Sequence, residues 1–161
     1  MNEENDILIC MYQEHLKQAR HQENQRSTMA NLILIISTGL LGVIALDKTF
    51  SFSDLPLAIF LFFLGLYGAI FTIKYYERFK LHYERSRNIR KEFDRRFKDL
   101  GISGLQKEAD KKTKEFFPIM FKLRLYWLWI SLLLIVSILG LGLLLSIIVM
   151  NTNYIRLGFC I

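Results

Sequence analysis

The chain has 161 residues and a formal net charge of +6, and 52% of its residues are hydrophobic. That average hides a separation, because the charged residues crowd into segments between three long apolar runs that contain none. A soluble protein distributes charge along its helices, since every surface helix needs a polar face. The pattern therefore excludes an ordinary soluble domain and predicts an all-α integral membrane protein.

The three apolar runs cover residues 29–46, 57–73 and 125–150. A helix rises about 1.5 Å per residue, so a run of about 18 residues spans about 27 Å, close to the hydrocarbon thickness of a bilayer. One such run could be a buried core helix, but the remaining chain is too short to cover three. We therefore predict three transmembrane helices, the first two forming a hairpin over residues 29–75.

Residues 1–28 form a polar segment that no proline or glycine interrupts. Leu8, Tyr12 and His15 fall on one side of a helix at helical spacing. This pattern predicts a cytoplasmic amphipathic helix that continues into the first span.

Small residues recur four positions apart in every span. Lipid provides no hydrophobic drive for helix pairing, so small residues matter because they let two backbones approach closely. We expect them to pack the spans into a compact bundle or an oligomer. The six candidate packing residues are Thr38, Gly42, Gly65, Ala69, Gly142 and Ser146.

The basic segment 76–124 begins with a heptad pattern that continues the second span. Its positions alternate in steps of three and four, and most are aromatic or aliphatic, as in the seam of a coiled coil. We expect this aromatic seam to pack against a partner helix, and within the chain the antiparallel N-terminal helix is the obvious candidate. The aromatic and aliphatic seam residues are Tyr76, Phe79, Tyr83, Phe93, Phe97 and Leu100, and Ser86 and Arg90 occupy the two polar seam positions.

A second amphipathic helix should follow from Ser103 to about Phe117, where Pro118 breaks it. Basic residues and phenylalanines mix in this part of the segment, which suits a helix lying on an anionic membrane surface. Anchoring to the anionic lipids of the inner leaflet is the simpler interpretation, and a lipid-specific or ligand-sensing patch is the alternative. The basic residues expected at the leaflet are Lys111, Lys112, Lys114, Lys122 and Arg124.

Lysine and arginine predict the orientation, because the cytoplasmic loops of membrane proteins carry an excess of them. With three spans, the polar segments before the first span and between the last two lie on one side, and they hold nineteen Lys and Arg. The other side holds Lys48 and, in the short tail 151–161, Arg156. We predict a cytoplasmic N-terminus and an external C-terminus.

Motifs for catalysis or cofactor binding are missing from the sequence. It has no CxxC, HExxH, Walker loop, GxGxxG or GxSxG pattern. A metal site built on the three histidines is the less favoured alternative, because no carboxylate or thiolate cluster completes it. We expect no enzymatic activity, cofactor or metal, and we interpret the Arg-rich stretch 85–96 as a solvated helix face rather than a nucleic-acid site.

Short basic motifs accompany this order of parts. The polar helix carries Gln18–Ala19–Arg20 and Gln25–Arg26, and the charged helix carries Arg85, Arg87 and Phe93. Over about residues 6–100 the chain resembles the SLATT group, bacterial membrane domains of two to three spans found with nucleotide-activated anti-phage defence systems. It is also similar to small octameric membrane proteins of the RipA type. The resemblance implies a homo-oligomeric effector of the bacterial inner membrane that permeabilises it once triggered.

We weigh two functional hypotheses, and the first rests on what the resemblance implies. The first is an oligomeric inner-membrane effector that forms a pore or disrupts the membrane in anti-phage defence, with a nucleotide or a cytoplasmic protein as its trigger. The apolar runs contain no Asp, Glu, Lys, Arg or His, so any pore would form between subunits and be lined by hydroxyls, glycines or apolar rings. The second is a non-catalytic membrane scaffold or assembly protein whose helical region docks a cytoplasmic partner.

Overall fold

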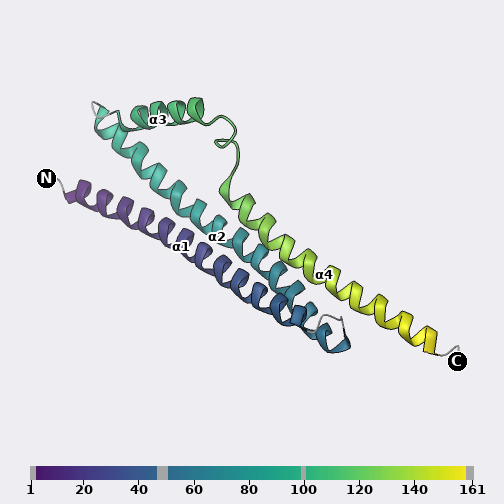
Figure 1. Cartoon of the computed structure of the whole chain (residues 1–161). Helices are drawn as coiled ribbons and strands as arrows, with labels where there is room; N and C mark the ends of the chain where they lie inside the picture. The colour runs from purple at the N-terminus through teal and green to yellow at the C-terminus, as the bar shows by residue number, and fades with distance from the viewer. Residues whose placement is uncertain (1–2, 47–50, 99–100, 159–161) are drawn as a thin grey trace. The chain divides into compact units, whose positions relative to one another are not determined.

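The computed structural model describes residues 3–46, 51–98 and 101–158, and every element in those ranges is helical. The elements are α1 (Glu3–Leu46), the short 3-10 helix η1 (Phe52–Asp54), α2 (Leu55–Arg96), α3 (Ile102–Phe116) and α4 (Leu125–Gly158) (Figure 1). Three of the helices, α1, α2 and α4, are long and apolar enough to cross a membrane. The predicted helical class and its three apolar helices are confirmed, and they are consistent with a multi-pass membrane protein.

The last helix is longer than the sequence predicts. The apolar run ends at residue 150 and the tail 151–161 is predicted to be a short external segment, yet α4 continues to Gly158. Polar side chains in the extra turns satisfy their hydrogen bonds on the helix itself, because Asn151 Nδ2 donates to the Ile147 carbonyl at 2.8 Å and Thr152 Oγ1 to the Ile148 carbonyl at 2.9 Å. Loss of hydrophobicity alone therefore does not end this helix.

The start of α2 is fixed by a local hydrogen-bond network. The Ser51 N–H donates to Asp54 Oδ2 at 2.9 Å, and the Asp54 N–H donates to the Ser51 carbonyl at 3.1 Å. Pro56 stands in the first turn of α2, where its missing N–H has no helical partner to lose. These residues explain why the helix begins where the second apolar run begins.

The chain divides into two compact units. Unit 1 comprises residues 1–26 and 74–127, and unit 2 comprises residues 27–73 and 128–161. The divisions lie near the ends of the apolar runs, so nearly all charged residues belong to unit 1.

Each long helix buries one narrow stripe in unit 2. The buried positions follow one another mostly in steps of three, four or seven, the spacing of helices that cross at a shallow angle. The remaining apolar side chains are half-buried or exposed, as expected of helices that cross a membrane. The buried residues are Ala30, Ile33, Ser37 and Ile44 on α1, Ala58, Leu61, Gly65, Gly68, Ala69 and Thr72 on α2, and Ile130, Leu133, Val136, Ser137, Gly140 and Ile147 on α4.

A close contact in unit 2 joins α2 and α4 through glycines. A Cβ added at Gly65 would lie 2.5 Å from the Ser137 backbone nitrogen, and one added at Gly140 would lie 2.4 Å from the Phe62 backbone nitrogen. The hydroxyl of Ser137 crosses the contact and donates to the Phe62 carbonyl at 3.0 Å. The two backbones therefore touch, which is how small residues stabilise helix pairs in lipid.

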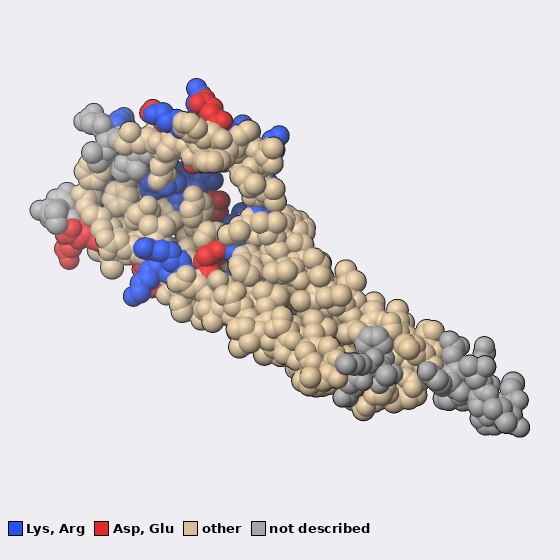
Figure 2. All heavy atoms as spheres, viewed as in Figure 1, with Lys and Arg blue, Asp and Glu red and all other residues tan. Residues whose placement is uncertain are grey.

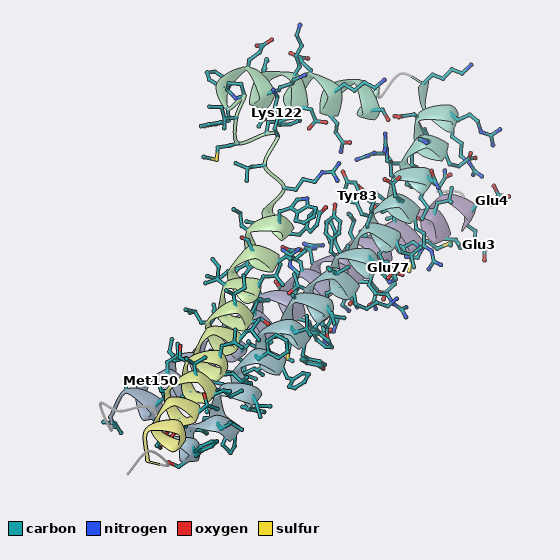
Figure 3. All side chains as sticks on the ribbon, turned by 90° about the vertical axis from the view of Figure 1, so that its right-hand side faces the viewer. Glu3, Glu4, Glu77, Tyr83, Lys122 and Met150 are labelled. Atoms are coloured by element: carbon teal, nitrogen blue, oxygen red, sulfur yellow. The ribbon has the colours of Figure 1, made fainter. Side chains whose placement is uncertain are left out.

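In unit 1 the first part of α1 lies antiparallel to the last part of α2. Arg96 Nη1 lies 3.1 Å from Glu4 Oε2, and Figure 3 labels Glu4 at the start of α1. Farther along, the rings of Tyr12 and Phe93 meet edge-on with centroids 6.3 Å apart. Residue numbers rise along α1 as those of their partners fall along α2, so the two helices run antiparallel. The N-terminal helix is thus a neighbour of the charged helix, as the sequence predicts.

Charged pairs order the last turn of α2. Glu92 accepts hydrogen bonds from Arg95 Nη2 at 2.7 Å and from Arg96 Nε at 2.9 Å. These hydrogen bonds lower the pKa of the Glu92 carboxyl to about 2, and the bond from Arg95 has the larger effect. The arginines also place positive charge at a helix C-terminus, where the backbone dipole favours it.

Candidate functional site

A cleft of about 430 Å³ lies between α2 and α3 in unit 1. This volume falls within the range of roughly 300–1,000 Å³ that is usual for small-molecule sites. Figure 2 shows Lys and Arg side chains around a hollow beneath α3. The lining residues are Tyr83, Arg87, Arg90 and Lys91 from α2 and Ser103, Gln106, Lys107 and Asp110 from α3.

A glycine and a carboxylate hold α3 beside α2. Gly101 has φ +51°, in the left-handed region that residues with a side chain rarely adopt, and it directly precedes α3. The Ser103 N–H then lies 3.3 Å from each carboxylate oxygen of Asp94, and the Ser103 hydroxyl donates to the same carboxylate. The cleft is thus bounded by a turn that needs glycine and by a bond between its two walls.

Positive charge dominates the cleft. Four cationic side chains, Arg87, Arg90, Lys91 and Lys107, line it together with one carboxylate, Asp110. Arg87 Nη1 lies 3.6 Å from a Glu84 oxygen, whereas within residues 3–46, 51–98 and 101–158 the other three cations have no ion pair. Like charges gathered in one concavity attract anions, and guanidinium groups match the geometry of phosphate. The cleft is therefore suited to a phosphorylated ligand.

Stacked aromatic rings lead from α4 to this cleft. Tyr126 stacks on Tyr76 with centroids 4.0 Å apart and an interplanar angle of 16°. Tyr76 stacks on Phe79 at 6.2 Å, and Phe79 stacks on Tyr83 at 6.0 Å. Tyr83, labelled in Figure 3, is 43% exposed and forms part of the cleft wall.

The residues of the predicted aromatic seam are thus divided between neighbours. Tyr76, Phe79 and Tyr83 stack on one another and on α4, while Phe93 contacts α1. Phe97 follows the end of α2 and is 38% exposed. Leu100 lies outside the described residues. Pairing with α1 alone does not account for the seam.

The candidate packing residues of the spans also divide. Gly65 and Ala69 are buried on the face of α2 described above. Gly42 and Gly142 have open space beside them, with no described atom within 4 Å of an added Cβ. Thr38 and Ser146 are exposed, and their hydroxyls donate to carbonyls of their own helices.

The basic residues expected at the inner leaflet are all exposed. Lys111, Lys112 and Lys114 lie on α3, and Lys122 and Arg124 lie in the segment that joins α3 to α4. Large apolar side chains surround them and are also exposed: Phe116 at 78%, Phe117, Ile119 at 72%, Met120, Phe121 and Leu123. This combination of exposed cations and exposed apolar residues is the composition of a membrane-surface contact.

Two histidines meet between α1 and α2 in unit 1. The Nδ1 atoms of His15 and His82 are 3.4 Å apart. Burial, followed by the charges of His15 and Arg85, lowers the pKa of His82 below its ordinary value, and Glu14 opposes this shift. Protonation of His82 is therefore disfavoured in the folded unit.

Several residues of these sites were not selected as candidates from the sequence. Ser137 and Gly140 lie near the Gly142–Ser146 pattern and form a close helix contact, but they are three residues apart, so the four-residue spacing does not select them. The cationic cleft depends on α3 folding back at Gly101, which no local pattern predicts. The sequence signal for the α2 wall of the cleft is the three-residue spacing of Arg87 and Arg90, which places both side chains on one side of the helix.

Comparison with known proteins yields no matching family model, no matching curated protein and no matching solved structure.

Proposed function

We propose that the chain is an oligomeric effector of the bacterial inner membrane, of the SLATT type, which permeabilises the membrane in anti-phage defence and has no catalytic role. Its N-terminus would be cytoplasmic and its C-terminus external. The three long apolar helices and the basic segment between the last two support this proposal.

The observation that carries the oligomer is the contrast among the glycines of the spans. Gly65 and Gly140 lie against the backbone of a neighbouring helix, whereas Gly42 and Gly142 border open space in one protomer. Small residues in membrane helices are enriched where helices meet. We assign the open glycine faces, with the exposed Thr38 and Ser146 beside them, to contacts between copies.

A conducting path would lie between copies rather than within one. The apolar runs contain no ionisable residue, and the described part of unit 2 buries only narrow stripes between its helices.

The cationic cleft is the place for the trigger. An effector that damages its own cell must stay inactive until a signal arrives, and the cleft has the charge and volume for a phosphorylated small molecule. Neutralising its cations would remove the repulsion between α2 and α3.

The test measures assembly and depolarisation in the same strains. Gly42→Leu should break the assembly, seen as a shift from one discrete oligomer to smaller species in native mass spectrometry, and should abolish depolarisation of a membrane-potential dye. Val43→Leu, which enlarges an adjacent exposed side chain, is the matched control and should leave both unchanged. A monomer that still depolarises cells would refute the oligomer, and no depolarisation with the trigger present would refute permeabilisation.

A specific observation supports the scaffold as a second candidate. Tyr83 and Phe97 keep 43% and 38% of their surface exposed in unit 1, so part of the aromatic seam is free to contact a partner. A monomer that copurifies in mild detergent with one cytoplasmic protein, and releases it in a Tyr83→Ser or Phe97→Ser variant, would favour the scaffold over the effector.

A further inference from the structure

We propose that a second pocket in unit 1 binds the phosphate headgroup of an anionic membrane lipid. The pocket has a volume of about 370 Å³ and is distinct in its residues from the cationic cleft. It is lined by Glu23 and Arg26 of α1, Tyr76 and Phe79 of α2, and Arg124, Leu125 and Tyr126 around the start of α4. This inference does not depend on pore formation.

The main observation is the state of Arg26. Its side chain is only 3% exposed, and one guanidinium nitrogen donates to Glu23. The Nε of Arg26 is buried and has no hydrogen-bond partner among the residues that the structure describes. A buried donor without an acceptor is costly, so an oxygen supplied by a ligand in the pocket would stabilise this arrangement.

Charge and shape favour a phosphate on a lipid. Arg26 and Arg124 outweigh the single carboxylate of Glu23, which leaves the pocket positive. Arginine forks pair with phosphate through two parallel hydrogen bonds. The stacked rings of Tyr76 and Tyr126 provide an apolar wall, which suits the glycerol and acyl carbons of a lipid better than a free anion.

The residues that line the pocket lie at the ends of the three apolar runs, where lipid headgroups are expected. Arg26 precedes the first apolar run, Tyr76 follows the second, and Arg124 immediately precedes the third. Residues at these positions of membrane proteins lie at headgroup level, where tyrosine and arginine are common. One pocket thus collects side chains from the ends of all three runs.

Native mass spectrometry of the full chain in mild detergent tests this inference, with phosphatidylglycerol, phosphatidylcholine and inorganic phosphate as the three probes. We expect one phosphatidylglycerol retained per protomer and weak retention of phosphatidylcholine. Arg124→Gln should weaken phosphatidylglycerol binding about tenfold, because a charged hydrogen bond is removed. Lys80→Gln removes the same charge at an exposed position of α2, outside the pocket and outside the residues expected at the leaflet, and should change binding less than twofold.

Arg26→Gln should have an effect at least as large as Arg124→Gln, but its burial makes folding a concern. Arg124 is exposed, so its variants provide the safer comparison, and Arg124→Lys should restore part of the affinity. Equal losses for Arg124→Gln and Lys80→Gln would overturn the site in favour of a diffuse basic surface. Full displacement of the lipid by millimolar inorganic phosphate would overturn the lipid as its ligand. Neither result bears on depolarisation, which tests the proposed function separately.

Discussion

The contact between α2 and α4 makes a sharp prediction for Gly140→Ala. The new Cβ would lie 2.4 Å from the Phe62 nitrogen and 2.8 Å from its Cα, where ordinary contacts are 3.4–4 Å. The obstructing atoms belong to the backbone, so the helices must separate by about 1 Å, a shift derived from these distances. That shift would also stretch the 3.0 Å hydrogen bond from Ser137 to Phe62 beyond bonding distance.

The expected magnitude combines three effects. Overpacking costs about 1–3 kcal/mol, and the lost interhelical hydrogen bond costs about 0.6 kcal/mol. Replacing glycine by alanine within a helix returns about 0.5–1 kcal/mol. The net loss in the free energy of unfolding should therefore be about 0.6–3 kcal/mol.

Unfolding in mixed micelles of dodecyl maltoside and dodecyl sulfate, followed by tryptophan fluorescence, measures this loss. Gly142→Ala is the control on the same helix, because no described atom lies within 4 Å of its added Cβ. It should be neutral or slightly stabilising in the monomer. Equal stability of the Gly140→Ala and Gly142→Ala proteins would refute the close backbone contact.

Two further predictions concern unit 1. Burial lowers the pKa of His82, so between that lowered pKa and about 6.5 the unfolded chain binds more protons than the folded chain. The contribution of His82 to the free energy of unfolding should therefore be full above about pH 6.5 and should decrease as the pH falls toward the lowered pKa. His82→Gln should flatten this pH dependence when unfolding in micelles is measured from pH 8 to 5, while His21→Gln, at an exposed site, should leave the pH dependence unchanged. An unchanged slope in His82→Gln would contradict the assignment of the pH dependence to His82. The stacked pair of Tyr76 and Tyr126 should give a coupling energy of about 0.5–1.5 kcal/mol in a double-mutant cycle with leucine. Strictly additive losses would show that the rings do not interact.

The broad architecture could be predicted because it depends on composition alone. Runs without charge must leave water wherever they lie, so the three long apolar helices follow from counting residues. The pairing partner of a helix depends instead on its angular face, and one residue of offset turns it by about 100°. Ser37 is buried while its neighbour Thr38 is exposed, and motif spacing alone does not distinguish them.

The candidate sites were harder to predict because they join residues that are distant in the chain. Arg26 is indistinguishable in the sequence from other basic residues beside a span, and only its burial against residues 76–126 sets it apart. Arg87 and Lys107 likewise become neighbours only because the chain reverses at Gly101. Local patterns do not contain such long-range information.

The segment after α3 has a practical consequence for isolating unit 1. Phe116, Ile119 and Met120 expose 68% or more of their surface, and they lie within unit 1, outside the three apolar runs. A fragment that lacks the three apolar runs would keep these exposed apolar side chains, and it would aggregate or adsorb to surfaces in aqueous buffer. Detergent or a lipid bilayer would be needed to keep the fragment in solution.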